Sequence, residues 1–407
     1  MKALEKKYLL PFALVTSLFL LWGLANNMTD TLLAAFKRIM DMSDAQTSLI
    51  QFAFYGSYFC FALPAAIFIS RHSFKSGIIL GLLLYAAGAI LFLPAAYAAS
   101  YGFYLVAIYI MAGGCSVLET TANPYILSMG SPETATRRLN IAQSFNPIGS
   151  IIGILMSKYF ILKDISLYSV SGTYASLGLV LIAILVAMLF VKMPAGRDSG
   201  NRSGIIASFG RLFRNRLYRY GVVAQFFYVG AQIMCWTFII QYGTRYFMLE
   251  GMDERSAEVL SQRFNIYAML LFCASRFVCT YFLKYINPGK LLGILAVCAM
   301  VFTVGVIMLQ NRYGVYCLVG VSGCMSLMFP TIYGIALKGL GDDAKFGAAG
   351  LIMAILGGSV LPPLQALVID GDGMMGMPSV NVSFVLPFIC FVVVALYGWR
   401  CNACRKA

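Results

Sequence analysis

Long stretches of this chain carry almost no charge, and this pattern restricts its fold more than any other feature. Residues 76–132 contain a single formal charge, Glu119, and residues 8–36 contain only Asp30. A helix needs about 20 predominantly apolar residues to cross roughly 30 Å of hydrocarbon. Because such windows follow one another along the chain, the sequence predicts an all-α polytopic membrane protein.

Six apolar windows of spanning length lie on each side of a polar segment at the midpoint. The windows are 9–36, 45–70, 76–97, 101–129, 139–160, 168–191, 217–244, 257–284, 290–309, 313–337, 346–369 and 380–400. They predict twelve transmembrane helices in two six-helix halves, residues 1–192 and 217–407, joined by a basic cytoplasmic linker, residues 193–216. This plan is typical of the major facilitator superfamily fold, although the pattern alone also allows other twelve-span transporters.

The distribution of basic residues predicts the orientation in the membrane. The chain has a net charge of +14, and 21 of its 30 Lys and Arg fall in segments that are cytoplasmic if the N-terminus is cytoplasmic. The positive-inside rule then places both termini in the cytoplasm. Because topology explains the charge, we expect the lipid bilayer as a partner and no nucleic acid. The short loops favour a multi-pass protein of a bacterial inner (plasma) membrane.

Polar side chains interrupt the apolar windows at a few positions with helical spacing. Asn26, Asn27 and Asp30 fall within about one turn of the first window, and Glu119 lies four residues before Asn123 in the fourth. Charged groups at membrane depth are costly and mark substrate or ion pathways. We therefore predict Asp30 and Glu119 as proton-coupling residues of a membrane carrier.

A second group of polar and aromatic residues predicts the substrate. Amides bind sugar hydroxyls, and aromatic rings stack on the apolar face of a sugar. The predicted substrate-binding residues are Asn26, Asn27, Asn123, Gln143, Asn146, Gln225, Tyr228, Gln232 and Trp236. A structural role remains open for them, because Asn and Gln also hold membrane helices together. Arg276, in the eighth window, is expected to be a gate or packing charge rather than a ligand.

Six motifs spread along the chain are specific when taken together. They are WGLANNMTD, LIQFAFYGSYF, CSVLETTANPY, RLNIAQSFNPIG, AQFFYVGAQIMCW and FPTIYGIALKGLG. With them the sequence resembles the fucose/galactose/glucose:proton symporter family of the major facilitator superfamily, most closely its bacterial L-fucose:proton symporters.

The resemblance implies import of a monosaccharide, L-fucose in the first place, by alternating access with the proton as coupling ion and no other cofactor. It implies proton-linked roles for Asp30 and Glu119 and sugar contacts for Gln143 and Asn146. One departure from the L-fucose symporters is Phe329, which precedes Pro330 at a position where they carry tyrosine. This difference bears on sugar preference.

Other functions are compatible with part of the pattern. A galactose or glucose symporter of the same family is one alternative, and a sugar uniporter or exchanger without proton coupling is another. A membrane-embedded enzyme is disfavoured, because the chain has one His, no HExxH and no Gly-rich nucleotide loop. We therefore expect no enzymatic activity and no metal site. We expect a functional monomer, although the Gly149–Gly153 pair is equally compatible with packing within one chain and with an oligomer.

Overall fold

The structure is a computed structural model that describes residues 8–40, 44–161, 166–194, 205–371, 373 and 376–403. Eleven helical segments in this part of the chain are long and apolar enough to cross a membrane. A further, shorter apolar segment, Leu9–Ala25, belongs to the first helix. The predicted all-α polytopic class is confirmed.

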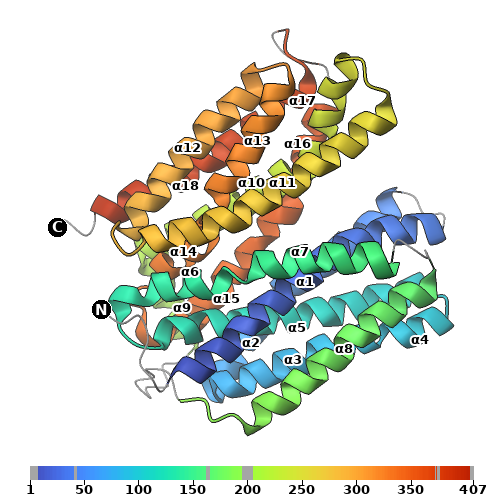
Figure 1. Cartoon of the computed structure of the whole chain (residues 1–407). Coiled ribbons are helices and arrows are strands. Elements are labelled where there is room, and N and C mark those ends of the chain that lie inside the picture. The colour runs from blue at the N-terminus through green and yellow to red at the C-terminus, as the bar shows by residue number, and fades with distance from the viewer. Residues whose placement is uncertain are drawn as a thin grey trace. The chain divides into compact units, whose positions relative to one another are not determined.

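The chain divides into two compact units, and the first contains residues 1–214 together with 337–353. Its helices are α1 (Leu9–Ile39), α2 (Asp44–Arg71), α3 (Phe74–Ile90), α4 (Phe92–Tyr97), α5 (Tyr101–Ser128), α6 (Ala135–Gln143), α7 (Asn146–Met156), α8 (Leu167–Phe190), α9 (Ile205–Arg214) and α15 (Ala344–Met353). Helix α5 packs against α2, α3, α6 and α15, and α1 packs along α7 (Figure 1). Residues 111–126 of α5 are therefore all buried.

Glycines bring α3 and α5 together until their backbones touch. A Cβ atom on Gly88 would lie 2.3 Å from the backbone nitrogen of Met111, and one on Gly114 would lie 2.3 Å from that of Tyr85. Small residues allow this close approach between membrane helices. The packing fixes α5, the helix that carries Glu119.

Helix α9, at the C-terminal end of the predicted linker, is docked on the first unit by a bidentate ion pair. The Arg211 guanidinium donates from Nε to Asp343 Oδ2 at 2.6 Å and from Nη2 to Oδ1 at 2.7 Å. Asp343 ends the short 3₁₀ turn Gly341–Asp343 that leads into α15. The rings of Phe209 and Phe346 pack beside it, 5.7 Å apart.

The second unit contains residues 215–336 and 354–407. Its helices are α10 (Arg216–Leu249), α11 (Glu254–Phe282), α12 (Pro288–Met308), α13 (Arg312–Met325), α14 (Met328–Ala336), α16 (Gly357–Ile369), α17 (Ser379–Val382) and α18 (Val385–Ala403). Helix α10 is central, because it packs against α11, α13, α14, α16 and α18. In this unit α13 and α14 together occupy the predicted tenth span, which is broken.

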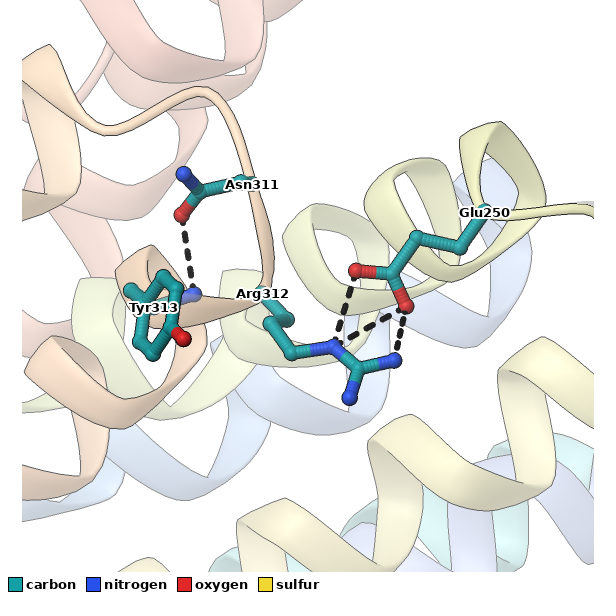
Figure 2. Close-up of polar contacts among 4 residues, drawn as sticks. All are labelled: Glu250, Asn311, Arg312 and Tyr313. Carbon is teal, nitrogen blue, oxygen red and sulfur yellow. Dashed lines mark hydrogen bonds and ion pairs between the residues drawn. The ribbon is translucent and has the colours of Figure 1, made fainter.

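An exposed ion pair ties the end of α10 to the start of α13, as Figure 2 shows. Arg312 donates from Nε to Glu250 Oε1 at 2.9 Å, and the neighbouring Asn311 accepts a hydrogen bond from the backbone nitrogen of Tyr313. The Arg312 guanidinium lowers the pKa of the Glu250 carboxyl. Exposed ion pairs of this kind contribute little to stability. The pair therefore joins the ends of two helices at the surface and adds little to the stability of the core.

Candidate functional site

Glu119 is buried in the first unit without the partners that a buried carboxylate normally has. Its exposed fraction is 1%, and neither carboxyl oxygen has a hydrogen-bond partner among the residues that the structure describes. The hydroxyl of Thr120 and the Nδ2 atom of Asn123 are also buried and have no hydrogen-bond partner among the described residues. An unsatisfied buried polar group costs about 1–3 kcal/mol, and more if it is charged. Such a cluster is expected where a proton, water or ligand supplies the missing partner.

Two predicted site residues meet beside Glu119. Gln143 at the end of α6 donates from Nε2 to the Oδ1 atom of Asn123 on α5 at 2.9 Å, and both side chains are buried. The bond fixes the Asn123 amide so that its Nδ2 group stays available as a donor. One turn separates this donor from Glu119 on the same helix.

Trp22 and Tyr58 were missed by the sequence analysis. The ring of Tyr58 on α2 stacks on that of Trp22 on α1, with centroids 6.5 Å apart and planes 17° apart. The Tyr58 hydroxyl and the Trp22 Nε1 are buried, and neither forms a hydrogen bond of normal geometry with a described residue. The only sequence signal was their presence in the WGLANNMTD and LIQFAFYGSYF motifs.

Tyr58 and Glu119 are held in register by hydrogen bonds between α2 and α5. Ser116 on α5 donates from Oγ to the Tyr58 carbonyl at 3.1 Å, and Ser57 on α2 donates to the Tyr109 carbonyl at 2.6 Å. The two bonds run in opposite directions between the same helices. They keep the phenol and the carboxyl group at a fixed separation.

Helices α1 and α7 carry further predicted residues. Asn27 donates from Nδ2 to the Gly23 carbonyl at 3.3 Å, and Asn146 is the first residue of α7. A Cβ atom on Gly23 would lie only 2.0 Å from the Asn146 carbonyl oxygen, so the two helices touch at this point. The side chains of Asn26 and Asp30 lie outside the described part of the structure, and their predicted roles stay predictions.

Helix α10 in the second unit carries the other predicted residues, on one stripe. Gln225 is completely buried, and neither its Oε1 nor its Nε2 atom has a partner among the described residues. Tyr228 donates its hydroxyl to the Met325 carbonyl at 3.0 Å, and Trp236 donates from Nε1 to Ser322 Oγ at 3.2 Å. The stripe therefore faces α13. The Gln225 amide is thus unpaired among the described residues, and Gln232 is half-buried. The polar atoms of Tyr228 and Trp236 are engaged in hydrogen bonds.

The comparison with known families covers most of the chain. The sequence matches the Major Facilitator Superfamily over residues 14–363. The chain belongs to this superfamily. It is a multi-pass membrane protein of a transporter family, and its relatives are named as transporters rather than enzymes.

The individual relatives confirm the narrower resemblance found in the motifs. An L-fucose-proton symporter of Haemophilus influenzae is 46% identical, with 98% of each chain covered. A glucose/galactose transporter of Brucella abortus is 29% identical, with 97% of this chain and 94% of that protein covered. The crystal structure of FucP of E. coli in the outward conformation has a TM-score of 0.87 and 32% identity, covering 97% of this chain and 99% of that chain.

Proposed function

We propose that this protein is a proton-coupled monosaccharide symporter and that L-fucose is its substrate. The observation that carries the proposal is Glu119, a buried carboxyl group with both oxygens unpaired among the described residues, one helical turn from the unpaired Nδ2 group of Asn123. The name of the 46% identical relative supports the choice of sugar. A glucose or galactose symporter is the second candidate, supported by the name of the Brucella relative.

The proposed coupling follows from the chemistry of Glu119. When the carboxyl group binds a proton it becomes neutral, which lowers the cost of its burial and gives it an O–H group that can donate to a sugar hydroxyl. The Asn123 amide supplies a second donor nearby. Sugar and proton then stabilise each other in the closed site. Asp30 is proposed to pass the proton to Glu119.

Transport then proceeds by alternating access, in which the loaded site opens to the cytoplasm. Release of the sugar lets water reach Glu119, so the charged form becomes favourable and the proton leaves. One proton crossing a potential of 100 mV supplies about 2.3 kcal/mol, which corresponds to roughly 50-fold accumulation of sugar. We propose that a monomer is sufficient, with both termini in the cytoplasm of a bacterial inner membrane.

The test is the external pH of a weakly buffered suspension of de-energised cells that make the protein. L-fucose, D-galactose and D-glucose are added in turn. We expect alkalinisation with L-fucose and not with an unrelated sugar. The Glu119→Gln variant should show no alkalinisation and no accumulation, yet still exchange labelled for unlabelled sugar. Glu133→Gln, which changes an exposed carboxylate of the same half, is the matched control.

Each alternative gives a different result in this assay. Alkalinisation with galactose or glucose alone would replace L-fucose by the second candidate. Uptake of tracer without a pH change would identify a uniporter or exchanger. Normal accumulation by Glu119→Gln would remove Glu119 from the coupling mechanism.

A further inference from the structure

The tenth span of the second unit is broken at a proline. Helix α13 ends at Met325 and α14 begins at Met328. Pro330 has no backbone N–H, so it cannot donate to the carbonyl of Ser326, four residues earlier. The helical pattern resumes when Thr331 donates to Leu327 at 3.3 Å. The break therefore leaves at least one carbonyl in the protein interior in need of a donor from elsewhere.

Two side chains from other helices supply donors at the break. Arg276 on α11 donates from Nε to the Ser326 carbonyl at 2.6 Å, and Tyr228 on α10 donates its hydroxyl to the Met325 carbonyl at 3.0 Å. Arg276 is only 3% exposed and Tyr228 is completely buried. The guanidinium also lies over the Phe272 ring, 4.6 Å from its centroid. The break is thus held by α10 and α11 together.

The use of a cation here needs a physical reason, because burying a guanidinium is costly. The sequence has no Asp or Glu between residues 259 and 341. The Ser326 carbonyl follows directly on the C-terminus of α13, where the helix dipole favours positive charge. A hydrogen bond with one charged partner is also stronger than a neutral one. Arg276 therefore replaces the donor that Pro330 lacks with a stronger one.

The break lies beside residues that the proposed function places at the sugar. The Phe329 ring is 6.4 Å from the Tyr228 ring and 6.2 Å from the Tyr333 ring. Gln225, with its unpaired amide, lies one turn before Tyr228 on α10. A change in the bend between α13 and α14 would move Phe329 relative to these groups.

We propose that Arg276 is a positioning residue for transport, which sets the bend between α13 and α14 and so fixes Phe329 beside Tyr228 and Gln225. The expected effect of Arg276 on sugar affinity rests on the proposed function. The expected effect of Arg276 on the bend does not rest on it, because the bend depends only on the hydrogen bond to the Ser326 carbonyl. The two can be measured separately in the purified full-length protein.

The experiment compares Arg276→Met, Pro330→Ala and the double variant. Arg276→Met should lower the thermal midpoint, because a charged hydrogen bond is lost. It should also raise the KM for sugar by about tenfold, because Phe329 is no longer held beside Tyr228 and Gln225, with a smaller change in maximal rate. Pro330→Ala restores an N–H group that can donate to the Ser326 carbonyl. In the Pro330→Ala background, removal of Arg276 should therefore lower the midpoint far less, so the two effects are not additive.

Two further variants keep the test decisive. Arg245→Met changes an exposed arginine of the same unit and should alter neither quantity. Arg276→Lys keeps a cation that can donate, and it should retain part of the sugar affinity. If Arg276→Met cannot be purified, the double variant should still be recovered, and its failure would overturn the proposal.

The contrary results are equally specific. A lower midpoint with an unchanged KM would make Arg276 structural only and would overturn the positioning role. Additive effects of Arg276→Met and Pro330→Ala would overturn the assignment of Arg276 to the bend. If the unmodified protein transports none of the three sugars, the proposed function fails, and the additivity of the thermal midpoints alone decides the bend.

Discussion

The fourth and tenth spans each contain a proline near the end, yet they respond to it differently. Helix α5 runs unbroken from Tyr101 to Ser128 through Pro124, whereas the tenth span separates into α13 and α14 ahead of Pro330. Helix α5 touches α3 backbone to backbone, so its path is fixed by that contact. The tenth span is held at its break by two side-chain donors. The surrounding contacts, rather than the proline alone, decide between a continuous and a broken helix.

The ionisable residues of these two regions are also treated in opposite ways. Glu119 on α5 is buried with both oxygens unpaired among the described residues, and we propose that they bind a proton and a sugar. Arg276, beside the tenth span, donates to a carbonyl and lies over an aromatic ring. The buried carboxyl group of the first unit is thus unpaired among the described residues, whereas the buried guanidinium of the second unit has a hydrogen-bond acceptor and an aromatic neighbour. Four predictions test this contrast, in order of decreasing effect.

The largest effect is expected where α5 touches α3. Gly114→Ala places a Cβ atom within 2.3 Å of the Tyr85 backbone and should destabilise the protein by about 1–3 kcal/mol, as overpacking does. Gly102→Ala on the same helix is the control, because a Cβ atom there meets nothing within 4 Å. The thermal midpoints of the purified variants measure the difference. Equal midpoints would show that backbone contact does not hold α5.

Gln225→Met should separate stability from binding in the second half. Removing an unpaired buried amide should raise the thermal midpoint without sugar, because the group is desolvated without compensation. The same change should weaken sugar binding by about fivefold to tenfold, the value of one hydrogen bond. Midpoints with and without sugar, together with KM, measure both effects. A lower midpoint in the absence of sugar would show that Gln225 has a structural partner.

The two prolines give the most direct comparison. Pro330→Ala should raise the KM for sugar by about threefold, roughly 0.6 kcal/mol, because the new N–H group favours a straighter tenth span. Pro124→Ala should change it less, since α5 is already continuous. Uptake kinetics of the two variants side by side decide the point. A larger effect at Pro124 would reverse the contrast.

The smallest effect is expected at the exposed Arg312–Glu250 pair. Because the folded protein lowers the pKa of Glu250, its stabilisation is present above the unfolded pKa of about 4.3 and is lost as the pH falls through the folded value. Glu250→Gln should therefore make the thermal midpoint less sensitive to pH in this acid range. Transport at pH 7 should change by less than about twofold. A large loss of transport would place this connection in the mechanism.

The sequence alone determined the class of protein and the approximate positions of the spans, and it singled out Glu119 as a charge inside an apolar window. These properties are local: the apolar length of a window decides whether it enters lipid, and a carboxylate within it is conspicuous without any knowledge of its neighbours. The motifs also led to the correct family. Pairs with helical spacing within one span, such as Glu119 and Asn123, could be read in the same way.

Only the tertiary structure decided which polar groups are used and which are left open. Gln225 and Tyr228 are both polar residues on one face of the seventh predicted span, so the sequence gives them the same predicted role. In the structure, the side chain of Gln225 has no partner among the described residues, whereas Tyr228 donates to Met325, 97 residues away. At the break in the tenth span, the Ser326 carbonyl accepts a hydrogen bond from Arg276, which lies 50 residues earlier in the chain. The rings of Trp22 and Tyr58 stack although they belong to different helices. Such contacts join residues far apart in the chain, and no local pattern records them, because they depend on how the helices pack.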